Sequence, residues 1–148
     1  MTRKIFIIII ALFLGFNAGF AQKIPSSQVP SLVLNHFNQS FPKAYDVEWK
    51  IKNDQYYAEF ETRRSIDHEA WYDQYGKLLK HKEDISTRKI PAAIQSAVKN
   101  NYKGFRMEDA KKITTGTSVQ YTVELKSPKQ DWKVWFNENG SVLQQHAD

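Results

Sequence analysis

One short pattern occurs twice in the sequence, and this repeat constrains the fold more than any other feature. AWYDQYGKLL covers residues 70–79, and VWFNENGSVL covers residues 134–143. Each copy has a tryptophan, a second aromatic residue, Asp or Asn, and a glycine three positions later. Short acid or amide side chains bond a turn backbone, and glycine accepts a positive φ. Each copy therefore predicts a strand, a hairpin turn and a second strand, within a duplicated structural unit.

A helical pattern precedes each hairpin. The two patterns open with Val-Pro at position 29 and Ile-Pro at position 90, and proline suits the first turn of a helix because its missing N–H costs nothing there. Apolar residues then recur at helical spacing. The residues expected on the buried helix faces are Val29, Leu32, Val33 and Phe37 in the first copy and Ile90, Ala93, Ile94, Ala97 and Val98 in the second.

Strand patterns lie between each helix and its hairpin. Residues 55–61 (QYYAEFE) and 120–126 (QYTVELK) alternate apolar and polar, which is typical of a strand with one buried face. Residues 45–51 predict the first strand of copy one. Its counterpart at residues 107–113 is fainter, and TTGTS at 114–118 predicts a longer loop.

These elements predict an α+β fold built as a tandem duplication of an α-β-β-β-β unit, with repeats at about 28–84 and 89–148. Four plus four strands would form one shared, curved antiparallel sheet with both helices on one face. Two separate small domains are the alternative. Because about 60 residues are marginal on their own, we expect a shared core instead, in a single domain over residues 22–148.

The N-terminus predicts secretion. A basic start, an apolar run at residues 5–16 and small residues before Ala21 form a signal peptide over residues 1–21, and the alternative is an uncleaved membrane anchor. The chain has no cysteine, so neither a lipid-modified cysteine nor a disulfide is available. We expect a periplasmic or secreted protein with no membrane contact after cleavage. The interleaved charges exclude the basic stripe that nucleic acids require.

The tandem copies, the Val-Pro and Ile-Pro helix openings, the repeated Trp-aromatic-Asp/Asn-x-x-Gly pattern and the signal peptide resemble the PepSY-like, β-lactamase-inhibitor-like family of periplasmic proteins from Bacteroidetes. The resemblance covers nearly all of residues 22–148 and implies two αββββ units that share one curved antiparallel sheet. It also implies that such a concave sheet can block the mouth of an enzyme. The faint strand at 107–113 departs from the family pattern. No activity of the family transfers to named residues.

No catalytic motif occurs in the sequence, so we expect neither an enzyme nor a cofactor. His68 stands between Asp67 and Glu69, but neighbours on a strand point to opposite faces and cannot converge on one metal ion. We expect His68 to be a satisfied core or rim histidine. The other histidines are singletons without ligand spacing: His36, His81 and His146.

Strand alternation places a group of carboxylates on the face away from the helices. Because Ca²⁺ prefers oxygen ligands, a calcium-responsive envelope protein is one alternative function. A solvated face balanced by lysines is the other interpretation, and the second copy has Lys126, Lys133 and Asn137 on that face. The acids are Asp46, Glu48, Glu59, Glu61, Glu69 and Asp73.

Alternation also turns Trp71 and Trp135 onto this open face, with Tyr57 nearby. Aromatic side chains among charges dominate interface hot spots, so we expect a non-enzymatic module that binds or inhibits an envelope protein or peptide. The expected contact residues are Trp71, Trp135, Tyr57, Glu59, Glu69 and Lys133. Lysine and arginine stems that cover the rings are the alternative without a partner. A small-ligand carrier would need a closed pocket, of which the sequence gives no sign.

Overall fold

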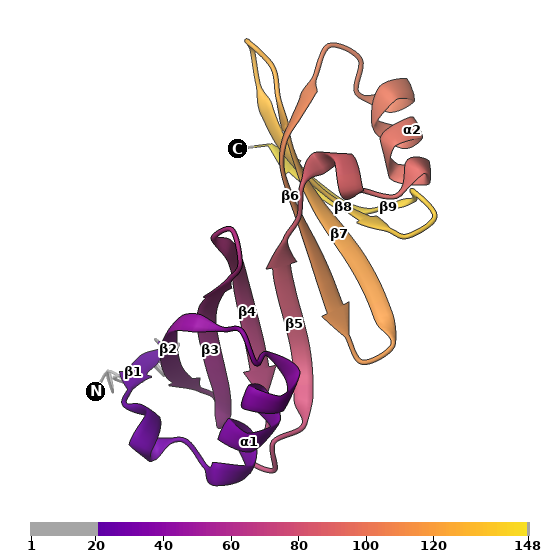
Figure 1. Ribbon diagram of the computed structural model, residues 1–148. Coiled ribbons are helices and arrows are strands. Elements are labelled where there is room, and N and C mark those ends of the chain that lie inside the picture. Colours follow the sequence, from indigo (N-terminus) through magenta and orange to yellow (C-terminus); the bar gives the residue numbers. More distant parts are fainter. Residues whose placement is uncertain (1–20, 148) are drawn as a thin grey trace, which may run out of the picture.

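A computed structural model describes residues 21–147 of the chain (Figure 1). The two α-helices are α1 (Ser31–Ser40) and α2 (Ala92–Asn101), and a short 3₁₀ turn precedes each of them, at Ser26–Gln28 and Thr87–Lys89. The signal peptide predicted for residues 1–21 lies almost wholly outside the described residues. The strands are β1 (Gln22–Ile24), β2 (Tyr45–Lys52), β3 (Gln55–Thr62), β4 (Ile66–Tyr72), β5 (Leu78–Asp84), β6 (Arg106–Thr115), β7 (Ser118–Lys126), β8 (Asp131–Asn137) and β9 (Val142–Ala147).

All nine strands form one antiparallel sheet in chain order, which confirms the α+β class and the single antiparallel sheet. Strands β2–β5 follow α1 and strands β6–β9 follow α2, so the element order fits a duplicated unit of one helix and four strands. Strand β1 is additional to the eight strands expected. It pairs with β2, where Ile24 lies opposite Trp49. Three residues are too few to show an alternating pattern, so β1 could not be predicted from its residues alone.

Both helices cover the same face of the sheet. In the first unit, the buried residues Ala58 and Ala70 lie opposite each other, and Ala70 lies opposite His81 of β5. His81 in turn pairs with Thr114 of β6. Side chains directly opposite in a sheet share a face, and Ala110, four residues before Thr114 on the same face, is buried under α2. The prediction of two helices on one face is therefore confirmed.

The apolar core is divided, and the prediction of a shared core was wrong. One cluster of buried residues lies under α1 and includes Phe37 and Trp49. A second cluster lies under α2 and includes Leu125 and Phe136. The inner face between them, at the β5–β6 seam, carries the opposed pair Glu83 and Lys112. These charged side chains interrupt the apolar surface, so the continuous sheet joins two separate apolar clusters. Figure 1 shows the two helices over opposite ends of the sheet.

Each helix buries a narrower face than its sequence predicted. Helix α1 buries Val33 and Phe37, but Leu32 is 52% exposed. Helix α2 buries Ile94 and Val98, one turn apart, and Ala93 is exposed. Leu32 and Ala93 stand one residue before the first buried residue of their helices, and the backbone carbonyl of each lies close to the hairpin turn.

The repeated hairpin turn also explains where each helix sits. Gly76 and Gly140 have φ of 85° and 86°, as the turn prediction requires, and Asp73 Oδ1 accepts a hydrogen bond from the N–H of Lys77. A Cβ on Gly76 would lie 2.7 Å from the carbonyl oxygen of Leu32, and one on Gly140 would lie 2.7 Å from that of Ala93. Each glycine therefore lets the backbone of a helix rest directly on its hairpin.

Two local features differ from the predicted strands. The TTGTS segment is no long loop, because β6 runs through Thr115, β7 begins at Ser118, and only two residues turn the chain. A bulge in β2 separates the pairs Tyr45–Glu61 and Glu48–Glu59. Such a bulge places an extra residue on one strand and shifts the alternation beyond it.

Candidate binding surface

The face of the sheet opposite the helices is here called the outer face. It carries the six expected contact residues: Tyr57, Glu59, Glu69, Trp71, Lys133 and Trp135. Pairing confirms their orientation, since Tyr57 lies opposite Trp71, Glu59 opposite Glu69, and Lys133 opposite Glu124. All six are half-buried. No helix of the described residues covers this face, and none is long and apolar enough to cross a membrane.

Tyr57 and Trp71 form a stacked aromatic pair on the first unit. Their ring centroids are 4.8 Å apart and their planes differ by 27°. Lys80 Nζ lies 4.5 Å from the Trp71 ring centroid, within cation–π range. Trp71 is therefore held between a tyrosine and a lysine. The lysine covers part of the ring, as the interpretation without a partner expected, and the rest of the ring faces solvent, as the binding interpretation expected.

The Tyr57 hydroxyl ties this pair to two acids. It lies 2.6 Å from Glu59 Oε1 and 3.0 Å from Glu69 Oε2, and its single proton can be donated to either carboxylate. Burial raises the pKa of Tyr57 well above its ordinary value, and the hydrogen bond to Glu59 raises it further. The phenol thus stays protonated and remains a donor.

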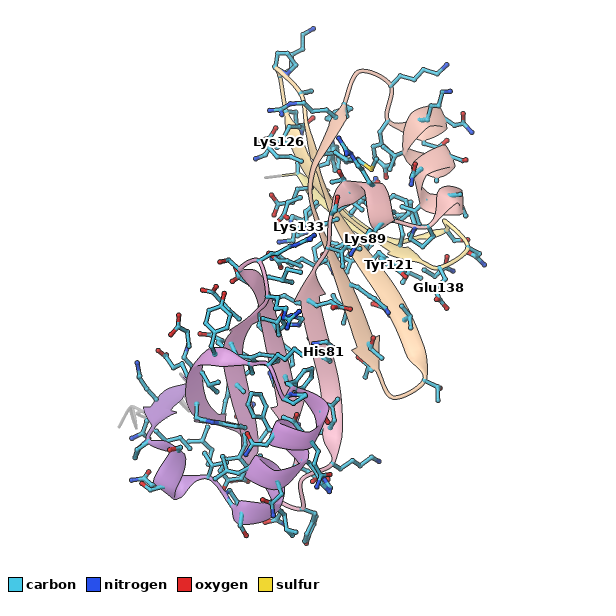
Figure 2. The ribbon with its side chains drawn as sticks, viewed as in Figure 1. His81, Lys89, Tyr121, Lys126, Lys133 and Glu138 are labelled. Carbon is cyan, nitrogen blue, oxygen red and sulfur yellow. The ribbon has the colours of Figure 1, made fainter. Side chains whose placement is uncertain are left out.

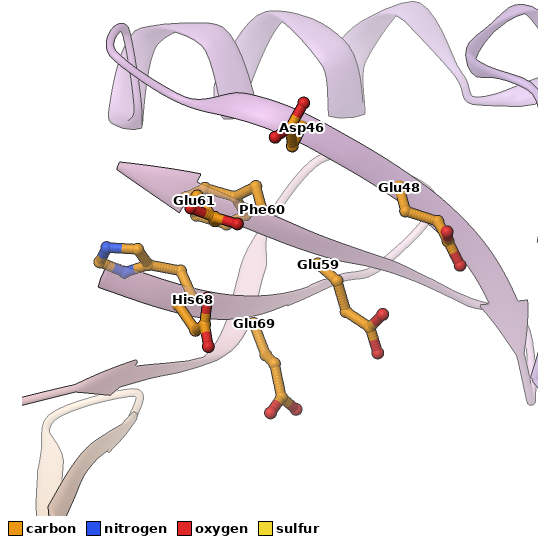
Figure 3. A pocket seen from close by; sticks show the side chains of 8 residues that line it. Asp46, Glu48, Glu59, Phe60, Glu61, His68 and Glu69 are labelled. Atoms are coloured by element: carbon orange, nitrogen blue, oxygen red, sulfur yellow. The ribbon is translucent and has the colours of Figure 1, made fainter. Parts of the chain in front are cut away.

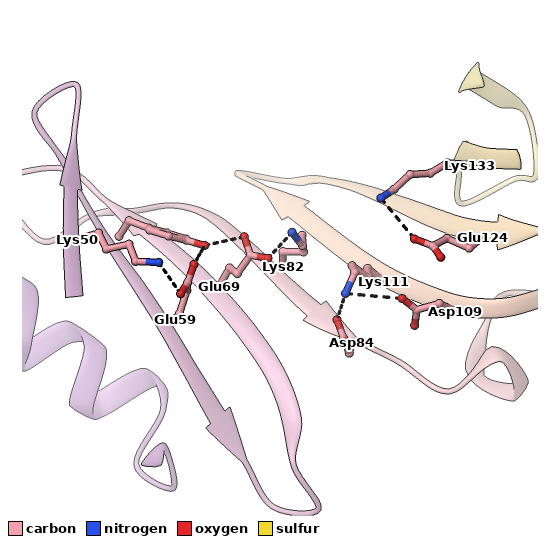
Figure 4. A network of polar contacts seen from close by, with 10 residues as sticks. Lys50, Glu59, Glu69, Lys82, Asp84, Asp109, Lys111, Glu124 and Lys133 are labelled. Carbon is pink, nitrogen blue, oxygen red and sulfur yellow. Dashed lines mark hydrogen bonds and ion pairs between the residues drawn. The ribbon is translucent and has the colours of Figure 1, made fainter. Parts of the chain in front are cut away.

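Lysines balance the acids of this face (Figure 4). Lys50 Nζ lies 2.7 Å from Glu59 and 3.4 Å from Glu48, and Lys82 forms an ion pair with Glu69. Burial alone would raise the pKa of Glu59, but the hydrogen bonds from Lys50 and Tyr57 keep it below its usual value. Within residues 21–147, no three His, Cys, Asp or Glu side chains converge as a metal ion would require. The acids Glu48, Glu59 and Glu69 of this face are therefore each paired with a lysine.

Two of the acids expected on the outer face lie elsewhere. Asp46, with φ of 51°, lies inside the β2 bulge, between the pairs Tyr45–Glu61 and Glu48–Glu59, and so does not follow the strand alternation. Figure 3 shows Glu48, Glu59 and Glu69 pointing away from α1, while Asp46 points toward the helix side. Asp73 lies beyond β4 and bonds the backbone of its turn. Period-two alternation could not reveal either departure, because a bulge and a strand end both break it.

Trp135 belongs to a second aromatic group on the other unit. Its ring centroid lies 5.0 Å from that of His146 on β9, and Lys133 Nζ lies 5.9 Å from the Trp135 ring. Lys133 also forms an ion pair of 3.5 Å with Glu124. Trp71 is on β4 and Trp135 on β8, so four strand spacings of roughly 4.8 Å, about 19 Å, lie between their strands. The strand register also offsets the two residues along the strand direction.

The strip of β5–β7 between the two aromatic groups carries residues that the sequence analysis did not single out. Lys80 and Lys82 of β5 lie opposite Trp71 and Glu69, and Ile113 of β6 lies opposite Lys82. Lys111 forms an ion pair with Asp84 across the β5–β6 seam, which the dashed lines of Figure 4 mark. Because β5 was predicted as a strand that pairs with β4, its alternation could have placed both lysines on this face.

A hollow of about 270 Å³ borders the first aromatic group. Tyr57 and Trp71 form one wall, and the turn between β2 and β3 forms the other. Its lining residues are Ala21, Lys52, Asn53, Gln55, Tyr57 and Trp71. The hollow lies at one end of the outer face, so a partner that covers the rings would also reach this turn.

His68 is buried, as predicted, and is only 7% exposed. Thr62 Oγ1 lies 2.8 Å from its Nε2, and its Nδ1 lies 3.1 Å from Nε2 of His81. His81 is therefore no singleton. Figure 2 shows it on β5, in the first unit. A separation of 13 residues in the sequence does not predict a contact between the two histidines. The pairing of β4 with β5 brings them together.

Comparison with known families finds one match. The family described as "Putative beta-lactamase-inhibitor-like, PepSY-like" matches residues 19–80 and again residues 56–144. Two overlapping matches along one chain fit a duplicated unit. No curated protein matches the chain.

Several solved structures share the fold. A DUF2874 family protein from Bacteroides uniformis is 18% identical, with a TM-score of 0.68 over 80% of this chain and 88% of its own. A protein from Bacteroides eggerthii named as a putative periplasmic protein is 17% identical, with a TM-score of 0.70 over 80% and 88%. A BLIP-like protein from Bacteroides fragilis is 19% identical, with a TM-score of 0.66 over 84% and 87%. At these identities the likeness concerns the fold alone.

Proposed function

The chain belongs to the PepSY-like, β-lactamase-inhibitor-like family, and we propose that it is a non-enzymatic periplasmic module that binds an envelope protein through the outer face of its sheet. The observation that carries the proposal is the placement of Tyr57, Trp71 and Trp135. All three rings are half-buried on a face that no described element covers, and each stands among charged side chains.

The chemistry of this face suits a protein surface. Aromatic side chains supply most of the binding energy of protein interfaces, and a charged rim adds specificity and speeds association. The ion pairs of Lys50, Lys82 and Lys133 already fix the positions of those charges. Little side-chain freedom would then be lost on binding, which lowers the entropic cost.

Lys80 indicates the charge of the partner. The Lys80 side chain contacts the Trp71 ring and, among the described residues, forms no ion pair with an acid. The neighbouring Lys82 and Lys111 are paired with Glu69 and Asp84. A partner loop that combines a carboxylate for Lys80 with an apolar or aromatic group for Trp71 fits best.

Location in the periplasm rests on two observations. The apolar run at residues 5–16 after a basic start is typical of a signal peptide. A structural relative from Bacteroides eggerthii carries the description of a periplasmic protein. A chain without cysteine can fold in that oxidising compartment without mispaired thiols.

The test compares three proteins as baits for envelope extract of a Bacteroides species: wild type, the Trp71→Ala/Trp135→Ala variant and the Leu32→Ala variant. Leu32 is the matched control, because it is an exposed apolar residue on the opposite side of the molecule. A candidate partner is one that wild type and Leu32→Ala retain and the double variant does not. Its affinity for each bait is then measured by calorimetry with the purified partner.

The proposal expects the double variant to lose at least about 2 kcal/mol of binding free energy, and Leu32→Ala to lose none. Equal affinity of all three baits would show that binding does not use the outer face. Purified serine β-lactamases form a separate panel, since the family name refers to their inhibition. Slower hydrolysis with wild type but not with the double variant would identify inhibition as the specific activity.

A further inference from the structure

The sheet has two edges, and they are protected to very different degrees. Edge strand β1 has three residues, Ile24 is only 9% exposed, and Lys23 pairs with Glu48 at 2.6 Å. Edge strand β9 has six residues, Val142–Ala147, and every one is exposed. Proteins blunt edge strands by shortness, charged side chains or proline. Strand β1 is short and carries a paired lysine, whereas β9 reads VLQQHA, with neither charge nor proline.

Strand β9 has a free backbone edge. It pairs with β8, and no strand within residues 21–147 pairs with its other side. Alternate N–H and C=O groups along that side therefore lack a partner strand, which is a template for strand addition. Val142 and Leu143 at its start are 42% and 49% exposed.

From this asymmetry we propose that β9 pairs antiparallel with β9 of a second copy, so that two sheets join into one. The sequence of β9 is self-complementary in this arrangement. When the outer faces of the two copies form one surface, an outer-face residue of one β9 must lie opposite an outer-face residue of the other β9. An axis at Gln145 places Gln144 opposite His146 of the second copy and Leu143 opposite Ala147, and it opposes no like charges.

The bulge at the start of β9 favours this register. Trp135 pairs with Gln144 and Phe136 pairs with Val142, so Leu143 is the extra residue and the regular stretch begins at Gln144. An axis at Gln145 centres the pairing on this regular stretch, with Gln144 opposite His146 of the second copy. Gln145 Oε1 accepts a hydrogen bond from Tyr102 at 2.5 Å, which fixes the central side chain while its amide N–H₂ remains a donor.

Dimer formation would extend the outer face without covering it. Trp135 lies on β8, one strand from the edge, so the two Trp135 rings would stand on one continuous face with two β9 strands between them. A ladder of five residues is small beside the roughly 1,200–2,000 Å² of stable interfaces, so we expect a weak, concentration-dependent dimer. This arrangement does not depend on the identity of the partner for the outer face.

Sedimentation equilibrium of the full mature chain measures the association directly, and single cysteines locate it. The chain has no native cysteine, so Gln145→Cys introduces the only thiol. The expected result is a wild-type monomer–dimer equilibrium, and rapid disulfide formation at position 145 under mild oxidation. Lys23→Cys on edge strand β1 is the matched control and should crosslink slowly. Far-UV circular dichroism verifies that each variant is folded.

A charge at the edge gives a second readout that does not rely on oxidation. Gln144→Lys should weaken the dimer roughly tenfold, about 1.4 kcal/mol, since a lysine is brought beside its symmetry mate and His146. Mixing Gln144→Lys with Gln144→Glu should restore it. A wild-type chain that stays monomeric at all concentrations overturns the proposal. So does a dimer that crosslinks as readily through position 23 as through position 145.

Discussion

His68 and His81 meet edge to edge inside the first unit. Nδ1 of His68 lies 3.1 Å from Nε2 of His81, the planes of the rings differ by 6°, and the ring centroids are 5.3 Å apart. Because the nitrogens are so much closer than the centroids, the rings share one hydrogen bond instead of stacking face to face. One ring nitrogen donates and the other accepts, so the pair is satisfied when both imidazoles are neutral.

The first prediction is that this pair makes the protein sensitive to acid. Burial lowers the pKa of both histidines; Glu83, Asp84 and Asp67 oppose that effect at His68, and Lys112 adds to it at His81. A lowered pKa means that the unfolded chain binds protons first. Stability is therefore complete above pH 6.5 and falls as the pH drops through the folded-state pKa values, by up to about 1.4 kcal/mol per pH unit for each histidine.

Urea denaturation at a series of pH values between 7.5 and 5 measures this slope. His81→Gln is the informative variant, because Gln145 pairs with Val134 of β8 as His81 pairs with Ala70 of β4, and the second unit folds with that glutamine. Its slope should be shallower than that of the wild type. Parallel curves for wild type and His81→Gln would contradict the prediction.

The second prediction concerns the Tyr72 hydroxyl, which is buried and has no hydrogen-bond partner among the described residues. Burial raises the pKa of Tyr72 to about 12. Phe136 occupies the matching hairpin position in the second unit and is also fully buried. Tyr72→Phe should therefore stabilise the protein by roughly 1 kcal/mol, because an unsatisfied buried hydroxyl carries a desolvation cost. Thermal unfolding of Tyr72→Phe and the reverse variant Phe136→Tyr checks this, and a stabilising Phe136→Tyr would contradict it.

The third prediction separates two roles of glycine. Gly140 and Gly104 have nearly the same φ, 86° and 87°, so alanine at either position meets the same backbone strain of about 1 kcal/mol. A Cβ at Gly140 would also lie 2.7 Å from the Ala93 carbonyl, whereas one at Gly104 meets no atom within 4 Å. Gly140→Ala should therefore cost at least about 2 kcal/mol more than Gly104→Ala, because a backbone atom cannot move aside cheaply.

Chemical denaturation of the two variants gives both free energies. Gly76→Ala should resemble Gly140→Ala, since its Cβ would lie 2.7 Å from the Leu32 carbonyl. Equal losses at Gly140 and Gly104 would mean that the helix moves away from the hairpin without cost.

The repeat explains how much of the fold could be predicted. Alternation in residues 55–61 and 120–126 assigned side chains to the two faces correctly, because regular strands obey it without reference to their neighbours. It failed at Asp46, where a bulge adds a residue to β2. It also gave no indication that the apolar core is divided, since the Glu83–Lys112 pair that separates the two clusters forms only when β5 and β6 come together.

The candidate surface was predictable residue by residue but not as an arrangement. Sequence placed Tyr57, Trp71 and Trp135 on the outer face, and the structure agrees. Their partners depend on long-range pairing: the cation over Trp71 comes from the next strand, and His146 reaches Trp135 from β9. Whether a tryptophan is covered or free is decided by such neighbours, which one strand pattern cannot supply.

The last prediction uses these contacts to rank the tryptophans by their effect on stability. Trp49 is 4% exposed in the core under α1 and packs edge-on against Phe37, so Trp49→Ala should cost about 3–5 kcal/mol. Trp71 keeps part of its surface in solvent and gains mainly from the Tyr57 stack and the Lys80 cation. Trp71→Ala should cost only about 1–2 kcal/mol, the sum of one aromatic pair and one exposed cation–π contact. Urea denaturation at neutral pH measures both values. A loss at Trp71 equal to that at Trp49 would make the outer-face ring a structural residue, and its substitution could no longer separate binding from folding.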